Sequence, residues 1–150
     1  MSTTATNALI LLARILLSFI FITSGFGKLT DPAGTAGMIA GAGLPAATAL
    51  AYLAGLFEFL AGLAVLIGFQ TRIAAFALAV FCIFTGAVFH SGTIAVPGWP
   101  EAALGWLNTL NSIMMMKNFT LAGGYLLLAT VGAGAYSLDA RRGAATVVPA

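Results

Sequence analysis

Charged side chains are scarce in this 150-residue sequence, which contains 6 Lys and Arg and 4 Asp and Glu, or 7% of its residues. Soluble domains carry roughly a quarter charged residues, so the composition excludes an ordinary water-soluble protein. The net charge of +2, without a longer basic run than Arg141-Arg142, predicts no nucleic-acid partner. By contrast, 61% of the residues are hydrophobic, which indicates that the solvent of this chain is lipid.

Histidine and cysteine are almost absent. A single histidine, His90, and a single cysteine, Cys82, cannot build a haem, copper or zinc site within one chain. No glycine-rich phosphate loop follows a strand, so we expect no metal, haem or nucleotide cofactor. If the chain takes part in redox chemistry, the electron carrier is expected to be a diffusible quinone or to lie on a partner protein.

Four apolar stretches are long enough to cross a hydrocarbon core, which takes about 20 helical residues. Their apolar residues do not alternate as in a membrane barrel, so closed helices are expected. We therefore predict an all-α integral membrane protein, a four-transmembrane-helix bundle over residues 1–142, followed by a flexible tail at 143–150. The predicted spans are residues 8–26, 46–69, 73–90 and 113–135.

The connections between these spans differ in length and composition. Residues 70–72 predict a tight turn, and the glycine-rich residues 28–45 predict a loop opened and closed by proline. Residues 91–111 form the longest connection, with a short interfacial helix expected at 101–110. Arginines gather on the side of the two termini, so the positive-inside bias places both termini in the cytoplasm. They are Arg72, Arg141 and Arg142.

Ionisable side chains interrupt these apolar spans, although burying an unpaired charge in hydrocarbon costs about several kcal/mol. Helical spacing places them on stripes of small residues, which mark helix contacts rather than lipid-facing surfaces. Glu58 lies near mid-depth of the second span and Arg14 in the cytoplasmic half of the first. Because pairing makes both burials tolerable, we predict a structural Arg14–Glu58 ion pair. In the alternative interpretation, Glu58 handles a proton or contacts a ligand.

Lys28, His90 and Lys117 fall toward the outer boundary of three different spans, with Asn118 beside the last of them. Each has a plain explanation: Lys28 can reach the headgroups, and His90 can cap its helix. Together, the excess of cations predicts a site for a quinone carbonyl, a lipid phosphate or an oxyanion. The candidate ligand-binding residues are Lys28, Glu58, His90, Lys117 and Asn118.

The order of these residues along the chain resembles the DoxX family of membrane proteins. The motifs that carry the resemblance are FITSGFGK at 21–28, EFLAG at 58–62, GFQTR at 68–72, FH at 89–90, MKNF at 116–119 and GAGAYSLD at 132–139. The resemblance is closest to the bacterial inner-membrane branch, and it implies a multi-pass, four-helix protein of that membrane. It points to functional positions at Arg14, Lys28, Glu58, His90, Lys117 and Asn118. The longer third connection, around residues 97–106, departs from the family pattern.

Members of this family include a membrane subunit of an archaeal thiosulfate:quinone oxidoreductase and proteins linked to thiol and oxidative stress. The leading hypothesis is therefore a membrane component of a quinone-linked oxidoreductase or redox-stress system, whose polar network binds a quinone head group. The alternative is a non-catalytic scaffold that recruits a soluble redox partner. A third hypothesis, a small transporter or lipid-binding protein, lacks the inverted repeat typical of transporters. The small-residue stripes also allow a homo-oligomer.

Overall fold

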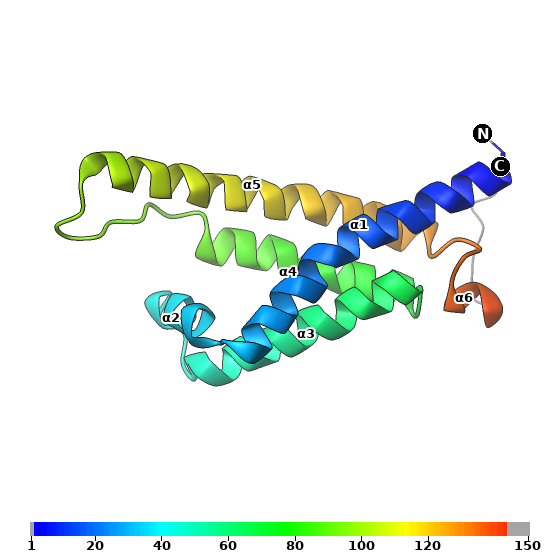
Figure 1. Cartoon of the computed structure of the whole chain (residues 1–150), viewed down its shortest axis with the longest axis horizontal. Helices are drawn as coiled ribbons and strands as arrows, with labels where there is room; N and C mark the ends of the chain where they lie inside the picture. Colours follow the sequence, from blue (N-terminus) through cyan, green and yellow to red (C-terminus); the bar gives the residue numbers. More distant parts are fainter. Residues whose placement is uncertain (1, 144–150) are drawn as a thin grey trace.

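The computed structural model describes residues 2–143, and every regular element among them is a helix (Figure 1). The long helices are α1 (Thr3–Thr30), α3 (Ala47–Ile67), α4 (Thr71–Phe89) and α5 (Glu101–Val131), and the short ones are α2 (Ala33–Gly41) and α6 (Leu138–Arg141). By length and composition, α1, α3 and α4 can cross a membrane. The prediction of an all-helical membrane protein is confirmed in these three spans. The predicted tail lies outside the described residues, apart from Gly143.

The fourth predicted span is not confirmed as a membrane span. It belongs to α5, a helix of 31 residues that begins at Glu101 and ends at Val131. The separate interfacial helix predicted at 101–110 is wrong, because no break divides it from the rest of α5. Polar residues make α5 less apolar than the three spans. They include Asn108, Asn111, Lys117 and Asn118.

Two connections differ from the sequence prediction. The glycine-rich residues after α1 contain α2 rather than a loop, and α2 buries Ile39 as it packs against α3. Tertiary packing therefore overrides the low helix propensity of glycine. The turn between α3 and α4 occupies Gly68 to Gln70, two positions earlier than the predicted residues 70–72, since Thr71 already begins α4.

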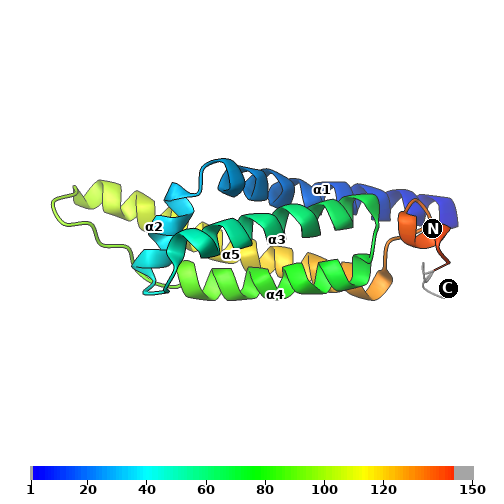
Figure 2. The ribbon, with the colours of Figure 1, turned by 90° about the horizontal axis from the view of Figure 1, so that it is seen from below.

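The long helices associate as two antiparallel pairs, α1 with α3 and α4 with α5 (Figure 2). The contact between α1 and α5 is slight by comparison. The start of α1, the α3–α4 turn and α6 lie at one end of the molecule (Figure 1). We call this the Arg14 end. The other end, with α2 and the α4–α5 connection, is called the pocket end.

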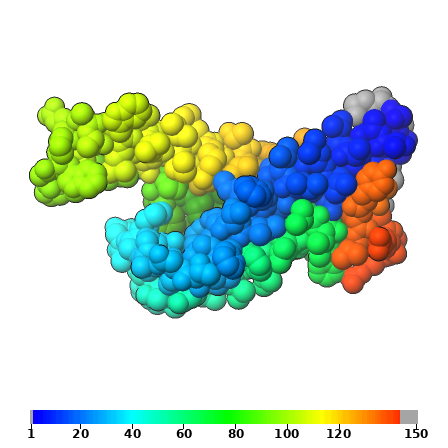
Figure 3. Space-filling model, viewed as in Figure 1, coloured from blue at the N-terminus to red at the C-terminus, as the bar shows by residue number. Residues whose placement is uncertain are grey.

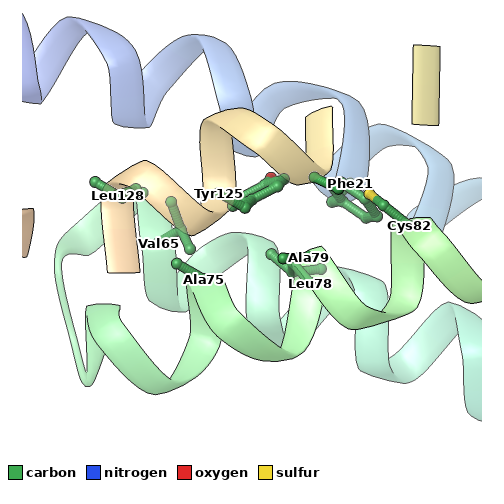
Figure 4. Packing of buried hydrophobic residues seen from close by; sticks show 9 residues of the cluster. Phe21, Val65, Ala75, Leu78, Ala79, Cys82, Tyr125 and Leu128 are labelled. Carbon is green, nitrogen blue, oxygen red and sulfur yellow. The ribbon is translucent and has the colours of Figure 1, made fainter. Parts of the chain in front are cut away.

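A hydrophobic core joins the two helix pairs (Figure 4). The Phe21 ring on α1 meets the Tyr125 ring on α5 edge-on, with centroids 5.5 Å apart. The Tyr125 hydroxyl donates to the Leu17 carbonyl at 2.7 Å, which satisfies its polar group inside the core. Small residues on α4 let the neighbouring helices approach, and their burial confirms the predicted contact stripe. They are Ala75, Ala79 and Cys82.

Candidate functional site

Arg14 does not pair with Glu58, and that prediction is wrong. The Arg14 side chain is only 1% exposed, and its guanidinium donates to four backbone carbonyls at 2.9, 2.5, 2.8 and 2.8 Å, those of Val65, Leu66, Ala133 and Tyr136. On α3, Val65 lies about two turns, roughly 10 Å, beyond Glu58. The physical reason is that a charged donor removed from water needs acceptors, and those within reach of Arg14 are carbonyls in the last turn of α3 and in the segment after α5.

Asp139 also belongs to the Arg14 end, and the sequence analysis did not identify it as a structural or functional residue. Its carboxylate accepts hydrogen bonds from the backbone N–H groups of Gln70 at 2.8 Å and Thr71 at 2.9 Å, so it caps the start of α4. Burial alone would raise the pKa of Asp139, but these hydrogen bonds and the positive charge of Arg14 outweigh it and hold the pKa below its usual range. The available signal was that Asp139 is one of only 4 acidic residues in the chain.

Gly68 fits between these groups because it has no side chain. Its φ of +71° lies in the left-handed region. A Cβ atom there would overlap the Ser137 side chain and lie 2.8 Å from Arg14 Nη2. The Asp139 N–H also donates to the Gly68 carbonyl at 2.8 Å. We call Arg14, Gly68, Ser137 and Asp139 the Arg14 cluster; its contacts hold helix ends together.

At the pocket end, a cavity of about 960 Å³ lies between the two helix pairs and extends to α2. Figure 3 shows a notch at this end, where the start of α5 (yellow-green) stands clear of α2 (cyan). All five predicted ligand-binding residues line the cavity, although they come from different helices and their surroundings are mainly apolar. They are Lys28, Glu58, His90, Lys117 and Asn118. Their role in binding stays a prediction.

Lys28, rather than Arg14, is the partner of Glu58. The Lys28 ammonium lies 2.8 Å from Glu58 Oε2 and donates a second hydrogen bond to Ser24 Oγ at 2.5 Å. The side chain of Glu58 is 5% exposed and that of Lys28 20% exposed. The pair therefore belongs to the interior of the bundle, and Lys28 does not reach out to the lipid headgroups.

A close approach of α1 and α3 brings this pair together. A Cβ atom on Gly25 would lie 2.5 Å from the Phe59 backbone nitrogen and 2.7 Å from the Gly55 carbonyl oxygen. No side chain fits there, so the two backbones are in direct contact. This contact confirms the predicted small-residue stripes on both helices, and it sets Lys28, one turn further along α1, beside Glu58.

Lys117 faces the cavity from α5 without a strong acceptor. Its ammonium donates to the Met114 thioether sulfur at 3.3 Å, and a thioether is a weak acceptor. No carboxylate in residues 2–143 lies within ion-pair distance of Lys117. The neighbouring Asn118 side chain is buried and donates to Thr85 Oγ1 at 3.3 Å. Lys117 and Asn118 on α5 therefore line the cavity and keep N–H groups that can still donate a hydrogen bond to a ligand.

His90 lies at the end of α4, where Asn111 orients its ring. The Asn111 amide nitrogen donates to the carbonyls of His90 at 3.2 Å and Gly92 at 2.9 Å. Its amide oxygen therefore faces His90 Nδ1 at 2.9 Å, which requires the hydrogen to sit on Nδ1. In the neutral ring, Nε2 is then left as an acceptor.

Comparison with known proteins places this arrangement in a family. The DoxX family profile matches residues 9–91. Inner membrane protein YqjF of Escherichia coli K12 is 42% identical over 130 residues, covering 87% of this chain and 88% of that protein. Inner membrane protein YphA of the same organism is 36% identical over 137 residues, covering 91% and 92%. No solved structure matches the chain. This chain therefore belongs to the DoxX family, as its motifs predicted.

Proposed function

We propose that the chain is an inner-membrane component of a quinone-linked redox system, and that its pocket binds the quinone head group. One observation carries this proposal: Lys117 stands beside an apolar cavity with donors that nothing stronger than a thioether accepts. The membrane assignment draws on the three apolar helices and on the two relatives named as inner membrane proteins.

The chemistry of a quinone suits this cavity. A quinone is a flat, mainly apolar ring with a carbonyl acceptor at each side, so it needs an apolar slot and donors at two places. Lys117 and Asn118 supply donors from α5, and Lys28 supplies them from α1. Aromatic rings of Phe57 and Phe81 lie 5.1 Å apart in the same wall and offer apolar contact to the ring.

Two groups at the pocket can exchange protons. Converting a quinone to a quinol takes two electrons and two protons. In the proposal, a soluble redox partner protein supplies the electrons, while Glu58 and the free Nε2 of His90 are placed to pass protons. The roles of Lys117 and Asn118 are to hold the carbonyl oxygens.

We further propose that α5 is the fourth membrane span and that the Arg14 end faces the cytoplasm. α5 runs along α4 and buries Ala122, Tyr125 and Leu128 in the core. The arginines outside the Arg14 cluster, Arg72, Arg141 and Arg142, belong to elements at the Arg14 end, which fits the positive-inside bias. Both termini would then be cytoplasmic. Reporter fusions at the C-terminus that are active only on the outer face would contradict this orientation.

The function is tested by asking whether the protein binds a quinone. We expect mass spectrometry of native membrane extracts to find a quinone that co-purifies with the protein. We also expect saturable binding when a short-chain ubiquinone is titrated into purified protein in lipid nanodiscs, with empty nanodiscs as the control for partitioning. Extracts without quinone, together with titrations indistinguishable from empty nanodiscs, would contradict the proposal.

A further inference from the structure

The wall of the pocket differs from side to side. Its cations and amide come from α1 and α5, whereas the side between α3 and α4 is apolar. On α4, Phe76, Val80 and Phe84 follow one another at a spacing of four residues, so they lie on one face of the helix. Leu53 lies on the facing helix, α3. The apolar part of the wall is thus a strip along two neighbouring helices.

These apolar residues form the rim of an opening. They line the cavity, yet 50–61% of the surface of each side chain is exposed: Leu53 61%, Phe76 57%, Val80 51% and Phe84 50%. A side chain that both lines a cavity and is half exposed lies where the cavity meets the outside. The pocket therefore opens sideways between α3 and α4, which run beside each other in Figure 2.

An aromatic bridge closes the gap between α3 and α4 deeper in the bundle. The rings of Phe57 on α3 and Phe81 on α4 are 5.1 Å apart, and Phe81 in turn lies 6.3 Å from Phe21 on α1. The opening lies beside this bridge, along the exposed side of α3 and α4. We call it the lateral window, with Leu53, Phe76, Val80 and Phe84 as its rim.

Because α3 and α4 are both apolar enough to span the membrane and the rim of the lateral window is apolar and exposed, we expect the window to face the lipid. Acyl chains surround such a rim, so a polar molecule gains nothing from passing it. A ligand with a polar head and an apolar tail fits both parts of the site. Its head can reach Lys28 and Lys117 while its tail leaves between α3 and α4 into the bilayer.

We infer that the ligand of this pocket is a lipid-tailed quinone that enters through the lateral window, rather than a small water-soluble quinone or catechol. This inference rests on the proposed function, which supplies the quinone head group, and the structure adds the tail. A tailless ligand would not require an exposed aromatic and aliphatic rim beside the lysines of the pocket, whereas a tailed ligand would use it.

The test compares the tailless ubiquinone head group with its decyl derivative. In Val80→Trp, the larger side chain fills the window, and we expect the affinity for the decyl derivative to fall about tenfold or more. The affinity for the tailless head group should change less than about twofold, because the head lies at Lys28 and Lys117. Ile83→Trp is the matched control, since Ile83 is exposed on α4 but does not line the cavity. It should leave both affinities unchanged.

The other outcomes separate the inference from the proposed function. If the unaltered protein binds both compounds and Val80→Trp weakens both equally or neither, the window is not the path of the tail, and the inference fails while quinone binding stands. If the unaltered protein binds neither, the proposed function fails as well. A decyl derivative with a photoreactive group at the end of its tail provides a second test, which uses the unaltered protein. Labelling of α3 and α4 at the rim supports the window, and labelling elsewhere overturns it.

Discussion

The two ends of this molecule both bury ionisable groups, but they satisfy them differently. At the Arg14 end, the guanidinium donates to four backbone carbonyls and Asp139 accepts two backbone N–H groups. At the pocket end, Lys28 pairs with Glu58, Lys117 donates to the Met114 thioether, and both lysines face a cavity. Buried polar groups in a finished fold find partners within it. The Arg14 cluster therefore stabilises the fold, whereas the donors at the pocket end are, in the proposed function, those that bind the ligand.

The largest effect is expected from removing the cation at the Arg14 end. Arg14→Leu leaves four backbone carbonyls without their donor, and we expect a loss of about 3 kcal/mol or more in the free energy of unfolding. Little monomeric protein should then survive thermal unfolding assays in detergent. Arg141→Leu is the control, since Arg141 is exposed on α6. If Arg14→Leu assembles and unfolds like the unaltered protein, Arg14 has no structural role, and the difference proposed between the two ends is wrong.

A smaller effect is expected where two backbones touch at the pocket end. Gly25→Ala forces α1 away from α3, and overpacking of this kind costs about 1–3 kcal/mol. The Lys28–Glu58 pair should loosen with it, so quinone affinity should fall together with the unfolding temperature. Gly27→Ala is the matched control, because nothing lies within 4 Å of a Cβ atom there. Equal unfolding temperatures for the two variants would show that the close approach does not matter.

These residues separate the features that the sequence predicts from those that it does not. The first three spans, the small-residue stripes and the gathering of Lys28, His90, Lys117 and Asn118 at one end were predictable, because apolar runs and helical spacing are local properties. The partners of Arg14 were not, because they are backbone carbonyls in the last turn of α3 and in the segment after α5, which no side-chain pattern reveals. Glu58 could have paired with either cation of α1, and the register set at Gly25 selected Lys28. The helix α2 escaped prediction because its stability comes from packing on α3.

The smallest effect concerns the dependence of stability on pH at the Arg14 end. Since the pKa of Asp139 is lowered in the folded protein, its contribution to stability is complete above about pH 4, the usual pKa of an unfolded Asp, and is lost as the pH falls through the folded value. We expect acidification from about pH 6 to about pH 3 to lower the unfolding temperature more in the unaltered protein than in Asp139→Asn. Equal decreases in the unfolding temperature of the two proteins would show that the Asp139 carboxylate does not stabilise the Arg14 end.

The central claim, that Lys117 serves a ligand while Arg14 serves the fold, is tested most directly by titrating decyl ubiquinone into Lys117→Ala protein. Because Lys117 donates only to a thioether within the described residues, this variant should unfold within about 2 °C of the unaltered protein. Its affinity for decyl ubiquinone should fall about tenfold or more, as expected for a lost charged hydrogen bond. Unchanged affinity, or a loss of affinity that accompanies unfolding, would contradict the account.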